Sequence, residues 1–155
     1  MPENKTLIPK QWIADNYRFL ESASIVLCAV SYLLRVFEVE GWGLAMVISF
    51  TFYASLIYLG AFLSHSYNQL ITSVCIRVSG ISGSVTLVGL MFAFLRFPGA
   101  RSMLQIGSVT LGISGLILFA LVVSGKEKTI QPLLIRSLIL CSLGVIHLFY
   151  FKSLM

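Results

Sequence analysis

Charged residues are scarce in this chain. Only 11% of its 155 residues are Asp, Glu, Lys or Arg, whereas a soluble globular domain carries about 25%. The hydrophobic share is 57%, the mean hydropathy is +0.92, and the few charges are gathered between long apolar runs. This distribution excludes an ordinary soluble domain. It predicts an all-α, polytopic integral membrane protein that forms a single domain over residues 1–155.

Carboxylates are lacking in the middle of every apolar run. The acidic residues lie in tails, in turns or at the edge of a predicted span, namely Glu3, Asp15, Glu21, Glu38, Glu40 and Glu127. Proton- or cation-coupled transporters generally place an ionisable or polar group at mid-membrane depth. The sequence therefore argues against coupled transport, while an uncoupled pore stays open.

Cysteine is scarce as well. The three cysteines are widely spaced in or beside apolar runs, which predicts packing residues rather than disulfides or a zinc site, at Cys28, Cys75 and Cys141. His65 has no second ligand near it in the sequence, so we expect no metal. No serine has the base and acid partners of a nucleophile, and no phosphate-binding glycine loop occurs. We expect no cofactor, and the sequence favours a non-enzymatic protein.

The apolar runs divide the chain into five predicted membrane helices. Residues 1–21 are polar and end in a predicted short amphipathic helix at the membrane interface. The expected spans are about 19–37, 41–63, 78–95, 102–125 and 133–151. The first is the weakest, because its charge-free stretch runs only from Ser22 to Leu34. A bundle of four spans is the alternative.

The basic residues indicate an orientation. With five spans, more Lys and Arg fall on the N-terminal side than on the other side. This bias predicts an N-terminus in the cytoplasm, for a protein of the bacterial cytoplasmic (inner) membrane. The net charge of +5 is explained by lipid headgroups at the helix ends, so the expected partner is the lipid bilayer and not nucleic acid.

A hairpin pattern occurs twice. Shifting the chain by 58 residues places Ser31–Ser49 on Gly89–Gly107 without a gap, and Gly41 then meets Gly99. Both stretches read as an apolar helix, a short turn with glycine and an uncharged returning helix. The pattern predicts a hairpin repeat, of which the fifth span would be a third, shortened copy. The alternative is that any two membrane hairpins look alike.

Small residues recur at helical spacing along the predicted spans. Residues four positions apart share a helix face, and small side chains there let helix backbones approach closely. The contact can lie within the chain or between chains. The residues expected to pack in this way are Gly41, Ala45, Ser49, Ser79, Gly83, Ser108 and Gly112.

The remaining polar candidates lie in the turns and at two positions within the spans. The turn residues form either a docking surface or solvated loop charge, and they are Glu38, Glu40, Arg96, Pro98, Gly99 and Arg101. Gln105 and His147 fall inside predicted spans. We expect each of them to hydrogen-bond to a neighbouring helix.

The stretch GLMFAFLRFPGARSMLQIG resembles the membrane hairpin of the gliding-motility and type IX secretion motor L subunit of Bacteroidetes and of similar small membrane proteins. The residues that fall on the pattern of an apolar helix, an aromatic-Pro-Gly turn and a glycine-containing helix are Phe97, Pro98, Gly99 and Gly107. The family's lysine and glutamate correspond here to Ala93 and Leu111. The resemblance therefore implies the hairpin architecture and not an ion-driven motor.

These patterns favour a non-enzymatic integral membrane subunit or scaffold. We expect it to associate through small-residue helix faces with another membrane protein or with copies of itself. The alternative is a small channel or uncoupled transporter that acts as an oligomer.

Overall fold

The computed structural model describes residues 8–63, 70–124 and 131–153, and in these residues all the regular secondary structure is α-helical. The helices are α1 (Ile8–Val36), α2 (Trp42–Leu63), α3 (Leu70–Phe94), α4 (Ala100–Val123) and α5 (Gln131–Ser153). Each contains a stretch that is long and apolar enough to cross a membrane. The all-α fold with five such helices is the one that the apolar runs predict.

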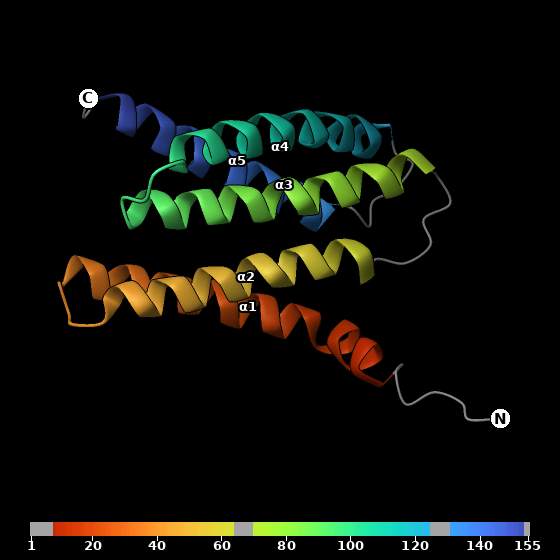
Figure 1. Ribbon diagram of the computed structural model, residues 1–155. Helices are drawn as coiled ribbons and strands as arrows, with labels where there is room; N and C mark the ends of the chain where they lie inside the picture. Colours follow the sequence, from red (N-terminus) through yellow and green to blue (C-terminus); the bar gives the residue numbers. More distant parts are fainter. Residues whose placement is uncertain (1–7, 64–69, 125–130, 154–155) are drawn as a thin grey trace.

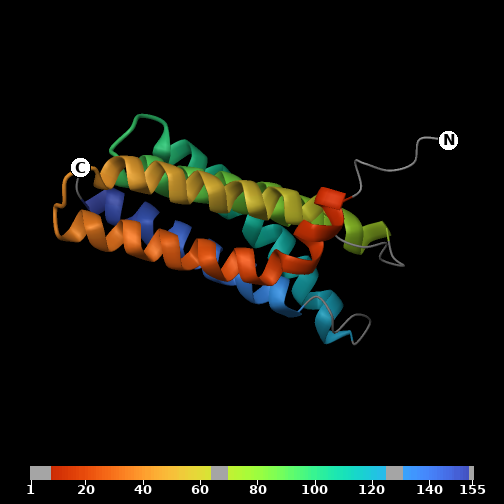
Figure 2. The same cartoon turned by 90° about the horizontal axis from the view of Figure 1, so that it is seen from below.

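The helices run up and down beside one another. In Figure 1, α1 to α4 follow one another from bottom to top, and α5 lies behind α3 and α4. Each helix packs against the next along the chain, and α3 also packs against α5. Helix α3 is therefore central: 61% of its most apolar stretch is buried, compared with 11% for α1. Figure 2 shows α1 and α5 along the same side of the bundle.

The largest buried cluster joins α2, α3 and α4. Its buried side chains include Met46 of α2, Leu87 of α3 and Leu104 of α4. A smaller cluster joins the other ends of α3 and α4 to α5 and contains Cys75, Ile76, Leu118 and Leu134. These clusters hold α2 to α5 together and leave α1 attached mainly through α2.

Glycines set the close approach of the central helices. A Cβ atom on Gly107 of α4 would lie 2.5 Å from Thr86 Oγ1 and 2.9 Å from the Thr86 backbone nitrogen in α3. A Cβ atom on Gly80 of α3 would collide with Ala61 of α2. Any side chain at these positions would push the helices apart, so the tight packing depends on glycine.

The turns 37–41 and 95–99 have the same backbone conformation, 58 residues apart. Glu38 has φ 51° and Arg96 has φ 57°, while Gly41 has φ 85° and Gly99 has φ 86°. The left-handed region is unfavourable for residues with a Cβ atom, so two such positions at matching places are uncommon. Both turns therefore reverse the chain by one and the same geometry.

Hydrogen bonds in the turns repeat at the same offset. The amide of Val39 donates to the Leu34 carbonyl at 3.0 Å, and the amide of Phe97 donates to the Phe92 carbonyl at 2.8 Å. Each bond joins an amide to the carbonyl five residues before it, one residue further than in a regular α-helix, and it closes the C-terminus of the helix. The hairpin α1–α2 and the hairpin α3–α4 thus share their turn geometry as well as their sequence pattern.

Two helix bounds differ from those predicted. Helix α1 is continuous from Ile8 to Val36, so the predicted interfacial helix is the first part of α1 and not a separate element. Helix α3 begins at Leu70, before the predicted start at 78, because the charge of Arg77 does not end the helix: the side chain is exposed and its guanidinium lies 5.9 Å from the Phe62 ring centroid. Residues 1–7 and the predicted end of the fourth span at 125 lie outside the described residues.

Candidate functional site

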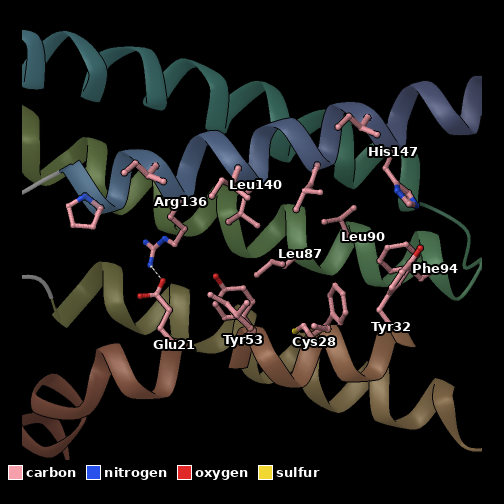
Figure 3. A pocket seen from close by; sticks show the side chains of 18 residues that line it. Glu21, Cys28, Tyr32, Tyr53, Leu87, Leu90, Phe94, Arg136, Leu140 and His147 are labelled. Atoms are coloured by element: carbon pink, nitrogen blue, oxygen red, sulfur yellow. Dashed lines mark hydrogen bonds and ion pairs between the residues drawn. The ribbon is translucent and has the colours of Figure 1, made fainter. Parts of the chain in front are cut away.

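A groove of about 630 Å³ runs along the bundle between α1 and α5 (Figure 3). Helices α2 and α3 form its floor, and α1 and α5 form its walls. Its walls and floor include Ala29, Tyr32, Phe50, Leu90, Ile139 and Leu143, and we call it the inner groove. In the described parts of the chain α1 and α5 make no backbone contact with each other, so the groove opens sideways between them.

One end of the inner groove is closed by an ion pair. Arg136 Nη1 of α5 donates to Glu21 Oε1 at 2.9 Å and to Tyr17 Oη at 3.0 Å, both of α1. The Arg136 side chain is 14% exposed and that of Glu21 is 23% exposed. A charge so removed from water is costly unless it is paired. The pair therefore neutralises this end of the groove and ties α1 to α5 (Figure 3).

The hydroxyl of Tyr53 faces the groove from α2, beside the ion pair (Figure 3). The residue is 6% exposed, and its hydroxyl makes no hydrogen bond to any residue within the described ranges. It leaves one polar atom available on an otherwise apolar floor.

The other end of the groove carries a cation among aromatic rings. The Arg35 guanidinium carbon lies 5.0 Å from the Phe94 ring centroid and 5.6 Å from that of Trp42. Phe94 also contacts Tyr32 at 5.4 Å and His147 at 4.7 Å between ring centroids. Arg35 has no carboxylate partner among the described residues. Its positive charge is held in place by rings and is not neutralised.

The two ends are separated by an apolar middle. From Glu21 to Tyr32 on α1, and from Arg136 to His147 on α5, the helical rise of about 1.5 Å per residue gives a length of roughly 16 Å. Aliphatic and aromatic side chains line this length. Such a wall can solvate an apolar chain, and it offers no row of polar groups to a hydrated ion.

A second groove, of about 400 Å³, lies between α4 and α5. We call it the outer groove, and its lining includes Gly112, Gly115, Leu116, Phe119, Leu138 and Cys141. A Cβ atom on Gly115 would meet nothing within 4 Å, and one on Gly112 would meet only Cys141 Sγ, at 3.7 Å. The exposed side chains of Leu116, Phe119 and Leu138 flank this shallow floor.

Several of the predicted small residues are already in contact inside the chain. The Ser49 and Ser31 hydroxyls lie 2.9 Å apart between α2 and α1, and those of Ser79 and Ser137 lie 2.7 Å apart between α3 and α5. A Cβ atom on Gly83 would lie 3.5 Å from both Ile57 of α2 and Leu140 of α5.

Of the other small residues predicted to pack, some contact a helix of the same chain and others lie beside open space. Ser108 of α4 lies against Gly144 of α5, where a Cβ atom would collide with the serine side chain. Ala45 is half-buried, and Gly41 lies in the first turn with open space around it. Gly112 lies in the outer groove and leaves space for a side chain from outside.

The predicted turn residues are all exposed. Glu38, Glu40, Arg96, Pro98 and Gly99 lie in the two turns, and Arg101 lies in the first turn of α4. None of the four charged residues forms an ion pair with another described residue. The structure therefore shows separate, solvent-facing charges in this region and no paired cluster.

The two polar residues within the spans have different surroundings. His147 lies at the Arg35 end of the inner groove, edge-to-face with Phe94. Gln105 is exposed on α4 and makes no hydrogen bond to the described residues. Within the described residues Gln105 therefore makes no interhelical bond, because it lies on an exposed face of α4.

Sequence reasoning missed the pairing of Glu21 with Arg136. In the sequence, Glu21 lies at the edge of the first predicted span and Arg136 near the start of the fifth, where a single charge is easily solvated. Both charges lie next to long apolar runs and near the same end of the predicted bundle, and this coincidence of opposite charges is the signal that indicates a pair. Among the residues described, no three His, Cys, Asp or Glu side chains gather into a metal site.

Comparisons with known proteins identify no relative: no protein-family model, no curated protein and no solved structure matches the chain. The resemblance of residues 89–107 to the motor hairpin stays a prediction based on those residues alone.

Proposed function

We propose that this chain is an integral protein of the bacterial cytoplasmic membrane, with five spans and its N-terminus in the cytoplasm. Large apolar side chains cover the outside of the bundle, including Leu44 at 68%, Ile106 at 66% and Leu116 at 71% exposure. Surfaces of this kind are unfavourable in water and suit a hydrocarbon environment. An odd number of spans puts the start of α1 and the end of α5 on opposite sides.

Within the membrane, the proposed role is that of a non-enzymatic subunit or scaffold. It associates with the helix of another membrane protein, or of a second copy, through the outer groove. The observation that carries this proposal is the open space above Gly115, where a Cβ atom would meet nothing within 4 Å. Most other small-residue faces are filled by a helix of the same chain, whereas this one is left free.

The shape of the outer groove suits a transmembrane helix. Small residues on its floor allow a partner backbone to come close, and the exposed side chains beside it form ridges for the partner to pack against. Association in lipid depends on such close packing, because lipid tails are as apolar as the helices themselves.

The alternative, a small channel or uncoupled transporter acting as an oligomer, gains no specific support. The conduction path of a channel would need polar groups along its length. The middle of the inner groove is lined by apolar side chains instead.

The decisive variant is Gly115→Leu, which adds a side chain to the outer groove at a position where a Cβ atom would meet nothing within 4 Å. The matched control is Ala120→Leu, at an exposed position of the same helix. The tagged protein is extracted from its own membrane in mild detergent and weighed by native mass spectrometry. We expect a second polypeptide or a second copy at fixed ratio, lost in Gly115→Leu and kept in Ala120→Leu. Association that survives Gly115→Leu contradicts the role of the outer groove.

The orientation is tested by reporter fusions at the C-terminus. We expect an alkaline phosphatase fusion to be active, since that enzyme requires the oxidising side of the membrane. A reporter that works only in the cytoplasm should be inactive there. The reverse pattern contradicts the proposed topology.

A further inference from the structure

The inner groove is open to whatever surrounds the bundle. On its α5 wall, Ile139 is 55% exposed and Ile146 is 63% exposed, although both face the groove. On its α1 wall, Ile25 is 50% exposed. Given the proposed membrane location, on which this inference rests, the groove meets the hydrocarbon of the bilayer along its whole length. A lipid chain can enter sideways between α1 and α5.

The groove is long and narrow, with about 630 Å³ of space along roughly 16 Å of helix. A lipid chain, being a single file of methylene groups, is thin enough to lie along the apolar middle.

An apolar chain alone would gain little from the groove, because the bilayer outside is equally apolar. Selectivity must come from a polar group at one end. At the α1–α5 ion pair, Arg136 already has Glu21 and Tyr17 as partners. At the other end, Arg35 has no carboxylate partner among the residues that the structure describes, and it is fixed over the Phe94 ring, which lines the groove.

We propose that the inner groove binds an acyl chain of an anionic phospholipid whose phosphate pairs with Arg35. The guanidinium forms two parallel hydrogen bonds with a phosphate, and its position beside the groove places the headgroup where the chain leaves the apolar middle. A zwitterionic headgroup is bound less well, because its own ammonium group competes for the phosphate. The bound lipid fills the gap between α1 and α5.

The test compares two lipids with identical acyl chains, phosphatidylglycerol and phosphatidylcholine. Each is titrated into the delipidated full-length protein, and retained lipid is measured by native mass spectrometry. We expect about tenfold tighter retention of phosphatidylglycerol, because the choline ammonium of phosphatidylcholine offsets part of the attraction between its phosphate and Arg35. Arg35→Gln should remove this preference and Arg35→Lys should keep part of it. Arg101→Gln, which removes an exposed cation at the same end of the bundle, should leave it unchanged.

A second variant tests the position of the chain. Ala29→Trp fills the groove from α1, and it should abolish retention of both lipids. Ala120→Trp, on the outer face of α4, should retain them. Circular dichroism establishes that each variant is folded before its lipid retention is compared.

Three results overturn the inference: equal retention of the two lipids, a preference that survives Arg35→Gln, or retention unaffected by Ala29→Trp. Loss of a dimer in Ala29→Trp, without loss of lipid, would assign the groove to a second copy and overturn it as well. Two further measurements distinguish a failure of this inference from a failure of the proposed function. Gly115→Leu should leave lipid retention unchanged, and release of the protein from membranes without detergent would contradict the membrane location itself.

Discussion

Arg136 and Glu21 lie 115 positions apart in the sequence, and their side chains meet at 2.9 Å. They belong to α5 and α1, two helices that make no backbone contact with each other in the described residues. The pair therefore joins the first and last helices of the bundle across the inner groove. It closes one end of that groove and leaves the rest open.

Glu21→Gln is expected to destabilise the protein. The substitution leaves the Arg136 charge partly buried without a counter-charge, and the loss should be about 2 kcal/mol in the free energy of unfolding. Chemical unfolding in detergent, followed by circular dichroism, measures it. Tyr17→Phe removes only a neutral partner and should cost less. The double variant Glu21→Gln with Arg136→Gln should recover part of the loss, and additive effects would contradict a direct pairing.

Gly107→Ala should separate α3 from α4. The added Cβ atom would overlap the Thr86 side chain and approach the Thr86 backbone nitrogen, and overpacking of this kind costs about 1–3 kcal/mol. Gly115→Ala is the matched control on the same helix, where the added atom meets nothing within 4 Å. It should leave stability unchanged or raise it by up to about 1 kcal/mol. In thermal unfolding, only Gly107→Ala should lower the midpoint, and equal losses in both variants would refute the close approach.

The two turns should respond alike to substitution. Gly41→Ala and Gly99→Ala each force a Cβ atom into the left-handed region, at φ 85° and 86°. Each should cost about 1 kcal/mol of stability. Gly43→Ala, where the nearest contact would be Leu95 Cδ2 at an ordinary 3.7 Å, should cost nothing. Unfolding midpoints of the three variants decide the matter, and unequal losses at the two turns would contradict their equivalence.

Cysteines at positions 79 and 137 should form a disulfide between α3 and α5. The hydroxyls of Ser79 and Ser137 lie 2.7 Å apart and both residues are buried. The experiment uses Ser79→Cys with Ser137→Cys after the native cysteines are changed to alanine, a membrane-permeant oxidant, and gel mobility before and after reduction. Ser79→Cys with Ser142→Cys is the control, since Ser142 is exposed. Cross-linking of the control alone would place α5 in another rotation.

Much of the architecture follows from the sequence because it depends on local patterns. The apolar runs give the number of helices, and the Glu40-Gly41 and Pro98-Gly99 turns mark where two of them end. The offset of 58 residues also predicts matching turns, since backbone reversal at each turn is a local property. Helix bounds were less accurate, as with α3 starting at Leu70, because an arginine ends an apolar run without ending a helix.

The helices, their apolar character and the small residues along them can be read from the amino-acid order, because each of these depends on neighbours along the chain. The folded arrangement is needed to show which small-residue faces are filled, at Ser49 and Ser79, and which leaves open space, at Gly115. It is also needed to show that Glu21 meets Arg136, while Arg35 lies against aromatic rings. Those outcomes depend on how each helix is rotated about its axis, and rotation is fixed by packing between distant segments.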